Sequence, residues 1–412
     1  MKTSLIKASL FLNYFVFAIL LNSVGAVILQ VQRNFNVSES TASVLEGFKD
    51  MPIAIASFLL ASLLPKFGLK RSMLLGLAMV AVGCFAMPFT DDFWYFKVLF
   101  AVIGVAFALI KVTVFATIGL ITDDTQGHSS FMSTLEGTFM VGVLLGNVLF
   151  SLFIDDADAS SQLWLQVYWI LGGLSVLAFL LLMVAELDES KASLDSRPLT
   201  EDFAAMLKLV AVPLVLVFVA SVFLFVLIEQ SFQTWTPTFY NSILQLPSSM
   251  SIQAGAVLAG AFAIGRFAAG FLLKRVHWFY LVSVCIIGCA AMVLVSLPLS
   301  RNVEFSTDAS WLSAPLVVYI FPLMGIFLAP IYPAINSVIL SSLPKHMHSS
   351  MSGLIVVFSA LGGTTGSIVT GNLFEHFDGQ TAFYLSIIPM ALLLLSVYLF
   401  KRLRSNHIQK TE

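Results

Sequence analysis

Apolar stretches of about 20 residues, separated by short polar breaks, recur along nearly the whole chain. Such a stretch is long enough to cross a hydrocarbon core of about 30 Å as an α-helix. The run from Leu171 to Val184 lacks the alternation of apolar and polar residues that a transmembrane β-strand requires. The pattern therefore predicts an all-α integral membrane protein.

The apolar windows predict twelve transmembrane helices. Their expected bounds are 8–31, 41–64, 72–90, 96–122, 131–154, 164–185, 208–234, 250–273, 278–299, 312–341, 349–373 and 381–402. The longest hydrophilic stretch, Glu186 to Asp202, lies near the middle of the chain. We therefore expect a six-helix half in residues 1–186, a cytoplasmic linker in residues 187–207 and a second six-helix half in residues 208–412.

Short internal repeats support the two halves. His128-Ser129-Ser130 opens the fifth helix and His348-Ser349-Ser350 opens the eleventh. Gly146-Asn147 and Gly371-Asn372 follow later in the same two helices. Because these matches fall at corresponding places, they indicate a duplication, which in membrane proteins is typical of transporters that work by alternating access.

Composition supports a membrane protein and excludes a nucleic-acid binder. The chain is 58% hydrophobic and 11% charged, with a mean hydropathy of +0.95, whereas soluble domains are about 45–50% apolar and about 25% charged. The net charge is −2, and no basic run is rich enough to follow a phosphate backbone. Cys84, Cys285 and Cys289 all lie in apolar stretches, so neither disulfides nor a metal site is expected.

Basic residues in the short loops predict the orientation, because Lys and Arg accumulate on the cytoplasmic side. If the N-terminus is cytoplasmic, fifteen of the 21 Lys and Arg residues lie on that side, three lie outside and three lie within helices. The outside set is Arg33, Lys97 and Arg301. We therefore expect both termini in the cytoplasm, and the short loops fit the inner membrane of a bacterium.

The loop between the second and third helices combines basic residues with glycine. The relevant residues are Ala61, Pro65, Lys66, Gly68, Lys70 and Arg71. This loop, and the chain over essentially its full length, resembles the major facilitator superfamily, although Pro65 stands where the family pattern has aspartate. The resemblance implies the major facilitator fold, with two pseudo-symmetric six-helix halves, a gating role for Lys66, Gly68, Lys70 and Arg71, and a monomer.

Further motifs are similar to the fucose, galactose and glucose proton symporters of this superfamily. They are Asn22-Ser23-Val24-Gly25, Glu229-Gln230 with Trp235, Gly265-Arg266-Phe267 with Gly270, and Tyr332-Pro333. The resemblance implies proton-coupled uptake of a small solute. It does not extend to the carboxylates that the fucose permease uses, because the first helix here has none and Lys111 stands at roughly the position of the fourth-helix glutamate.

Charged residues within the predicted membrane helices are candidates for function, because each costs at least about 2.5–3.5 kcal/mol to insert. Glu46, Lys49 and Asp50 share one face of the second helix through their i, i+3 and i+4 spacing. They form either a site for proton coupling or a neutralised structural pair. Lys111 lies deep in the fourth helix, and it either binds an anionic or hydroxyl-rich solute or serves as a partner for Asp50.

Two further charged residues suit gating or packing. Arg266 lies in the cytoplasmic half of the eighth helix, and Glu136 lies within two turns of the cytoplasmic start of the fifth. The glycines of the fifth and eleventh helices favour close helix packing. They are Gly142, Gly146, Gly362, Gly363, Gly366 and Gly371.

A polar and aromatic set in the second half is a candidate substrate site. Glu229 is expected near the outer end of the seventh helix, followed by Gln230, Gln233 and Trp235. Polar heads beside a flat ring suit a sugar, although an interfacial aromatic belt explains Trp235 equally well. Asn22, Tyr332 and Asn336 are candidates either for the same lining or for hydrogen bonds between helices. Glu229 is also a candidate for proton coupling.

The sequence therefore predicts a secondary active transporter for a small polar solute, sugar-like or an organic anion, and driven by the proton gradient. The chain has no Gly-x-x-x-x-Gly-Lys-Ser/Thr loop, so ATP is not expected as the energy source. The alternative within the class is an exporter of a drug, a metabolite or a carboxylate siderophore. Neither an enzyme nor a receptor is favoured, because no catalytic motif and no appended soluble domain is visible.

Overall fold

The computed structural model describes residues 2–61, 67–121, 125–189, 206, 208–300, 310–342 and 348–411. Within these ranges all regular secondary structure is helical. The chain divides into two compact units, which are described separately below. The first unit is Met1–Val37 with Leu45–Leu199, and the second is Ser38–Val44 with Thr200–Glu412. Most of the predicted linker, and the gating candidate Lys66, lie outside the described residues.

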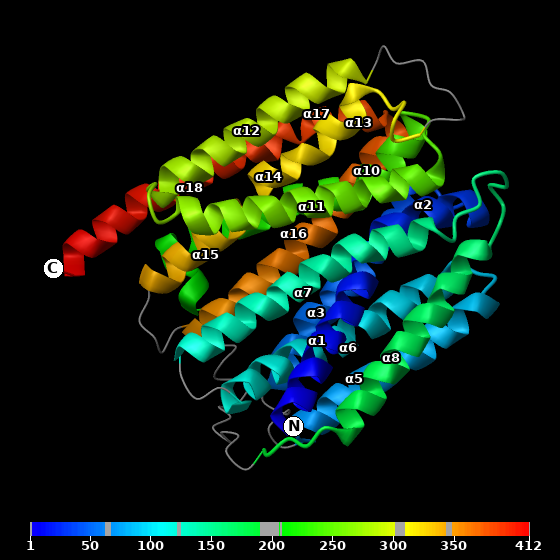
Figure 1. Cartoon of the computed structure of the whole chain (residues 1–412). Helices are drawn as coiled ribbons and strands as arrows, with labels where there is room; N and C mark the ends of the chain where they lie inside the picture. The colour runs from blue at the N-terminus through cyan, green and yellow to red at the C-terminus, as the bar shows by residue number, and fades with distance from the viewer. Residues whose placement is uncertain are drawn as a thin grey trace. The chain divides into compact units, whose positions relative to one another are not determined.

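The first unit is a bundle in which α1 is the central helix (Figure 1). Its helices are α1 (Lys2–Asn22), α2 (Val24–Phe35), α3 (Glu39–Ala61), α5 (Leu69–Ala86), α6 (Trp94–Ile121), α7 (Thr125–Ser151) and α8 (Val167–Val184). Helix α1 packs against α6, α7 and α8, and α5 packs against α6 and α8. Only the first residues of α3, up to Val44, cluster with the second unit.

The second unit repeats this arrangement around α10, along which α16 runs (Figure 1). Its helices are α10 (Pro213–Ser242), α11 (Ser248–Leu272), α12 (Trp278–Leu299), α13 (Leu316–Ile320), α14 (Met324–Leu328), α15 (Ile331–Ser342), α16 (His348–His376), α17 (Gly379–Leu385) and α18 (Ile387–Thr411). Helix α10 packs against α11, α16 and α18, and α14 packs against α11 and α12.

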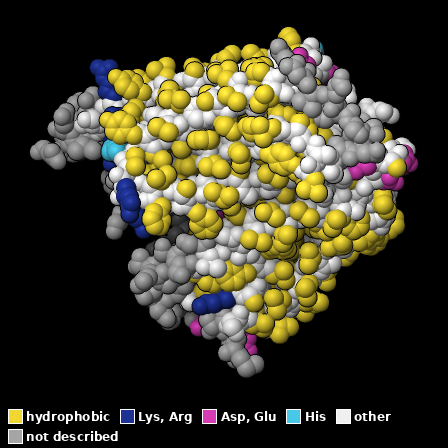
Figure 2. All heavy atoms as spheres, turned by 45° about the horizontal axis from the view of Figure 1, so that its top comes forward, with side chains coloured by type: hydrophobic (Ala, Val, Ile, Leu, Met, Phe, Trp, Pro, Cys, Tyr) yellow, Lys and Arg dark blue, Asp and Glu magenta, His cyan; other side chains and the backbone are white. Residues whose placement is uncertain are grey.

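Eleven helical segments of the described chain are long and apolar enough to cross a membrane. Helix α3 is the twelfth, and its composition differs because every 18-residue stretch of it contains Glu46, Lys49 and Asp50. Hydrophobic side chains cover much of the face shown in Figure 2, with Lys and Arg at its margins. On α12, for example, Val284 and Ile287 are more than half exposed, as lipid-facing residues are expected to be.

The first, tenth and twelfth predicted helices are broken rather than continuous. The first is interrupted at Ser23, between α1 and α2. The tenth is divided into α13, a 3₁₀ turn, α14 and α15, and Pro322 lies in that 3₁₀ turn. The apolar windows did not show these breaks, because a hydrophobic stretch reports only how long a segment is and not where its backbone hydrogen bonds are interrupted.

The seventh predicted helix was expected to end at residue 234, and this bound is wrong. Helix α10 continues to Ser242 and includes Pro237. The apolar window ends where polar residues begin, but membrane helices continue through polar residues and proline where neighbouring groups satisfy the backbone. The extension places Glu229 near the middle of α10 instead of near its end.

Small residues let the central helices approach closely in both units. A Cβ atom at Gly142 or Gly146 of α7 would meet the backbone or side chains of α1. At the corresponding contact of the second unit, a Cβ atom at Gly362 or Gly366 of α16 would meet the backbone of α10. The same four-residue glycine spacing therefore sets the distance between the paired helices in each unit.

We expect Gly142→Ala to lower the thermal stability of the purified protein. The added Cβ would lie 2.7 Å from Cβ of Ala18 and 2.9 Å from the carbonyl oxygen of Phe15, so α1 must move. Overpacking of this kind costs about 1–3 kcal/mol. Gly137→Ala in the same helix is the matched control, because nothing lies within 4 Å of its added Cβ. Equal melting temperatures of the two variants, measured in detergent, would contradict this account.

Candidate functional site

The first membrane segment is interrupted in its middle, where α1 ends at Asn22 and α2 begins at Val24. The side-chain amide of Asn22 donates to the carbonyl oxygen of Ala18 at 2.8 Å, and the Ser23 hydroxyl donates to that of Leu20 at 2.8 Å. The last four carbonyl groups of a helix have no partner within the helix. The Ser23 hydroxyl therefore satisfies one of these carbonyl groups, that of Leu20, whereas the Asn22 amide group is engaged one turn back within its own helix.

Lys49 of α3 supplies a further donor to this helix end. Its ammonium group donates to the carbonyl oxygen of Leu21 at 3.3 Å. It also pairs with Glu46, one turn earlier, and lies 3.6 Å from Oδ1 of Asp50. A cation at a helix C-terminus is favourable, because the aligned peptide dipoles leave partial negative charge there. The spacing-based expectation that these three residues share one face is met by these contacts.

Burial differs within this charged trio. The Glu46 side chain is fully buried, that of Lys49 is 8% exposed and that of Asp50 is 13% exposed. When all three are ionised the trio carries a net charge of −1, because one lysine faces two carboxylates. Asp50 is therefore the more exposed of the two carboxylates, and a role of the trio in proton coupling stays a prediction.

Close packing fixes the trio against α6. Gly104 of α6 faces the backbone of α3, and a Cβ atom there would meet the carbonyl group of Lys49 and the ring of Pro52. Glycine permits this approach because it has no side chain. The charged residues are thus presented from a helix whose backbone lies directly against α6.

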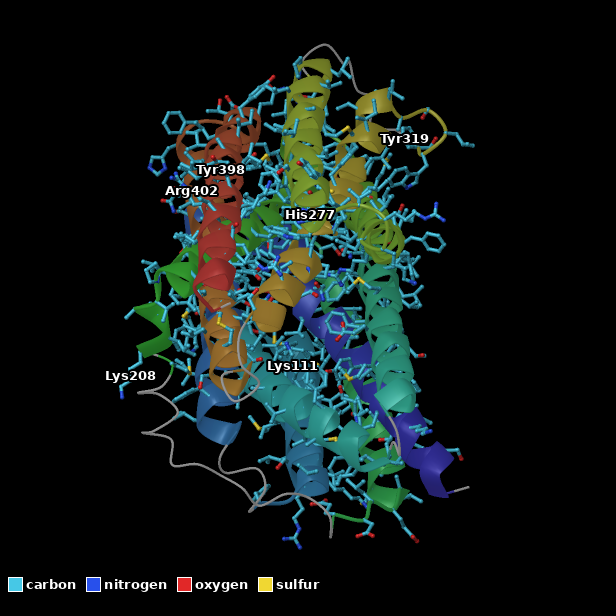
Figure 3. The ribbon with its side chains drawn as sticks, turned by 90° about the vertical axis from the view of Figure 1, so that its left-hand side faces the viewer. Lys111, Lys208, His277, Tyr319, Tyr398 and Arg402 are labelled. Carbon is cyan, nitrogen blue, oxygen red and sulfur yellow. The ribbon has the colours of Figure 1, made fainter. Side chains whose placement is uncertain are left out.

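Lys111 lies farther along α6, within the helical region rather than at a helix end (Figure 3). It is half-buried, and its ammonium group lies 5.8 Å from the centre of the Phe107 ring. Within the described residues the partner of Asp50 is Lys49, and Lys111 forms no ion pair within 4.0 Å. Glu136 of α7, which is exposed, interacts with Lys111 electrostatically. Of the two alternatives for Lys111, a pairing with Asp50 is not observed among the described residues, and a role in solute binding stays a prediction.

The second unit brings several of the predicted residues together around Tyr332 of α15. Its hydroxyl group lies 3.2 Å from that of Ser359 on α16, and Asn336, one turn further along α15, interacts with it. Glu229 of α10 and Arg266 of α11 act on it electrostatically. The Asn336 side-chain oxygen is buried and has no hydrogen-bond partner among the described residues, so this cluster retains an unfilled acceptor.

The remaining candidates of α10 are placed differently. Gln233 donates to Oε1 of Glu229 at 3.4 Å, and Gln230 is half-buried beside it. Trp235 is fully buried, and its indole N–H donates to the backbone oxygen of Ser367 at 3.1 Å. A fully buried ring does not face the membrane interface, so the explanation of Trp235 as part of an interfacial belt is wrong. Its role in substrate binding stays a prediction.

The basic loop before α5 forms a pair of helix caps that sequence reasoning missed. Gly68 has a φ of 97°, a conformation that favours glycine. The Glu189 carboxylate accepts the backbone N–H groups of Leu69 and Lys70, both at 2.9 Å, and thus caps the N-terminus of α5. In return the Lys70 ammonium donates to the carbonyl oxygens of Met183 and Ala185 at the end of α8.

Two of the four gating candidates in this loop take part in these caps. Gly68 and Lys70 position the ends of α5 and α8, while Arg71 is exposed. No sequence pattern pointed to Glu189, because it follows α8 by only a few residues and contacts a helix start that lies 120 positions earlier. A gating function of this loop stays a prediction.

Long apolar helices in two compact units, with ionisable groups inside the bundles, define a polytopic membrane protein in the described part of the chain. The family model of the Major Facilitator Superfamily matches residues 10–363 and 305–412. The chain belongs to this superfamily, and it is therefore a transporter and not an enzyme.

Individual relatives are distant. The chain is 18% identical over 395 residues to the protein TsgA homolog of Buchnera aphidicola subsp. Baizongia pistaciae (strain Bp), which covers 95% of this chain and 94% of the relative. Among solved structures it is similar to a bacterial homolog of the human lysosomal transporter Spinster, with a TM-score of 0.76, 14% identity and coverage of 99% and 98%. The E. coli fucose:proton symporter FucP matches with a TM-score of 0.61, 16% identity and coverage of 98% and 99%. These likenesses show the fold.

We expect Lys49→Met to destabilise the protein strongly. Removing one partner of a buried ion pair, here the partner of Glu46, typically costs about 3–5 kcal/mol. The double variant Glu46→Gln with Lys49→Met removes both charges and is expected to recover much of this loss. Melting temperatures in detergent test both statements. A single variant as stable as the parent protein would show that Lys49 does not hold the break in the first segment.

Proposed function

We propose that the protein is a secondary active transporter that moves a small polar solute, sugar-like or an organic anion, by alternating access and uses the proton gradient. The observation that carries this proposal is the buried trio of Glu46, Lys49 and Asp50 at the interrupted first segment. Superfamily membership supports transport, and the name of the fucose:proton symporter among the structural neighbours supports proton coupling.

In this proposal the trio alternates between two protonation states. When Asp50 is ionised, Lys49 is shared by two carboxylates and the Leu21 carbonyl group. When Asp50 takes up a proton, the trio keeps the pairing of Lys49 with Glu46, and its net charge becomes zero. The ionised state of Asp50 is costly, because its charge lies within the membrane. If the solute binds one protonation state of Asp50 more tightly than the other, solute movement is coupled to proton movement.

The proposed setting follows from the loop charges. We place the protein in the inner membrane of a bacterium with both termini in the cytoplasm, acting as a monomer without a cofactor. Lys401, over the ring of Phe279 at 4.1 Å, belongs to the basic residues at the end that we assign to the cytoplasm. Export of a drug, a metabolite or a carboxylate siderophore is the other direction that the same machinery permits.

The test is the internal pH of lightly buffered proteoliposomes while neutral sugars, sugar acids and small polycarboxylates are added outside. We expect one of these solutes to acidify the lumen, and Asp50→Asn to abolish this, because the amide cannot carry the proton while Lys49 stays paired with Glu46. If Asp50→Asn and Glu46→Gln both show as much proton entry as the parent protein, the trio is not the coupling site.

Asp158→Asn is the control. Asp158 lies in the loop between α7 and α8, and hydrogen bonds from Ser160 hold the pKa of its carboxyl below the ordinary value, so it does not exchange protons in the range of the assay. Solute uptake without proton entry would indicate facilitated transport instead. Proton movement only with solute inside the vesicles would indicate export.

A further inference from the structure

One face of α6 places a lysine between two aromatic residues. Phe107, Lys111 and Phe115 are spaced by four residues and therefore lie along the same side of the helix. Phe139 of α7 and Tyr14 of α1 approach this face from the neighbouring helices of the same unit. The five residues are called the aromatic lysine cluster below.

The rings of this cluster converge. The centre of the Tyr14 ring lies 6.5 Å from that of Phe107, 6.4 Å from that of Phe115 and 6.0 Å from that of Phe139. Phe107 and Phe139 are 6.4 Å apart. Phe115 and Phe139 are only half-buried, so part of the aromatic surface stays accessible.

The Lys111 ammonium lacks a counter-charge at close range. Its contact with the Phe107 ring is a cation–π interaction at 5.8 Å, which contributes about 0.5–2 kcal/mol. A charge at the centre of a membrane helix costs at least about 2.5–3.5 kcal/mol. Glu136 acts on it from an exposed position, but no carboxylate of the described residues lies within 4.0 Å. An anionic group placed beside Lys111 would remove this deficit.

A second polar group in the cluster is also unfilled. The Tyr14 side chain is 2% exposed, and its hydroxyl group has no hydrogen-bond partner among the described residues. A buried hydroxyl without a partner costs about 1–3 kcal/mol. A ligand acceptor that reaches this hydroxyl group would remove that cost.

We propose that the aromatic lysine cluster binds an organic monoanion that carries a flat apolar ring. The inference rests on the proposed transport function and selects one of its two solute classes. Four rings provide apolar contact for a ring, while Lys111 and Tyr14 provide one charge and one donor for a single anionic group. A sugar fits poorly, because its many hydroxyl groups need more hydrogen-bond partners than this face offers. Glu136 opposes a second negative charge, which favours a monoanion over a dianion.

The test is ligand binding to the full-length protein in detergent, measured as the rise in its melting temperature. Benzoate is the probe, benzyl alcohol has a similar ring without the charge, and acetate has the charge without the ring. We expect benzoate to raise the melting temperature at concentrations at which the other two and glucose do not. Equal effects of benzoate and benzyl alcohol, or of benzoate and acetate, would overturn the proposal.

Matched variants separate this site from general attraction of anions. Lys111→Met is expected to weaken benzoate binding by about tenfold or more, since a charge-assisted contact is lost. Lys97→Met is the control, because Lys97 lies on the same helix and also faces aromatic rings, at 4.9 Å from Phe93 and 5.6 Å from Trp94, but near the helix start. A loss of the same size in Lys97→Met would overturn the assignment.

Glu136→Gln provides a test that does not depend on the folding of Lys111→Met. Removing this competing carboxylate is expected to strengthen benzoate binding severalfold, and unchanged or weaker binding would count against the site. Failure of this binding site can be distinguished from failure of the proposed transport function. Benzoate binding without solute-linked proton entry would leave the site standing and remove proton coupling, whereas proton entry driven by a sugar without benzoate binding would do the reverse.

Discussion

The contact between the Lys49 ammonium and the end of α1 is the interaction on which the centre of the first unit depends. An interrupted helix leaves carbonyl groups without partners, and inside a membrane no water is available to satisfy them. A lysine at the same depth is equally unfavourable by itself. The Lys49 ammonium group donates to a carbonyl group at the end of α1 and pairs with Glu46 and Asp50, so each unfavourable group stabilises the other. The break at Ser23 and the charges of α3 therefore require one another.

The two units share a packing scheme but differ in their chemistry. In each unit a glycine pair brings a central helix against a partner, α1 with α7 and α10 with α16. The polar content around these similar contacts diverges. The first unit holds a buried lysine–carboxylate group and a lysine among aromatic rings, whereas the second collects hydroxyl and amide groups around Tyr332. The two units therefore share how their central helices pack but not which side chains surround them.

Periodicity and length were sufficient to find the helices, because membrane spans are defined by a simple physical requirement. The i, i+3 and i+4 spacing in α3 likewise predicted that Lys49 faces both carboxylates. The sequence could not show that Lys49 reaches Leu21, since Asn22-Ser23-Val24-Gly25 fits a continuous helix as well as an interrupted one. It also could not show that Tyr14 and Phe139 meet the Lys111 face, which depends on how three helices pack, nor that Trp235 points into the second unit.

The reciprocal caps of Lys70 and Glu189 show which residues the first unit needs to complete its helix ends. Helix α8 stops at Val184, yet the N-terminus of α5 is completed only by a carboxylate five residues further on. Anyone dividing this gene to produce the first unit separately must therefore keep the chain through Glu189. A cut at the last helical residue would preserve every membrane span and still remove the side chain that closes the opposite helix.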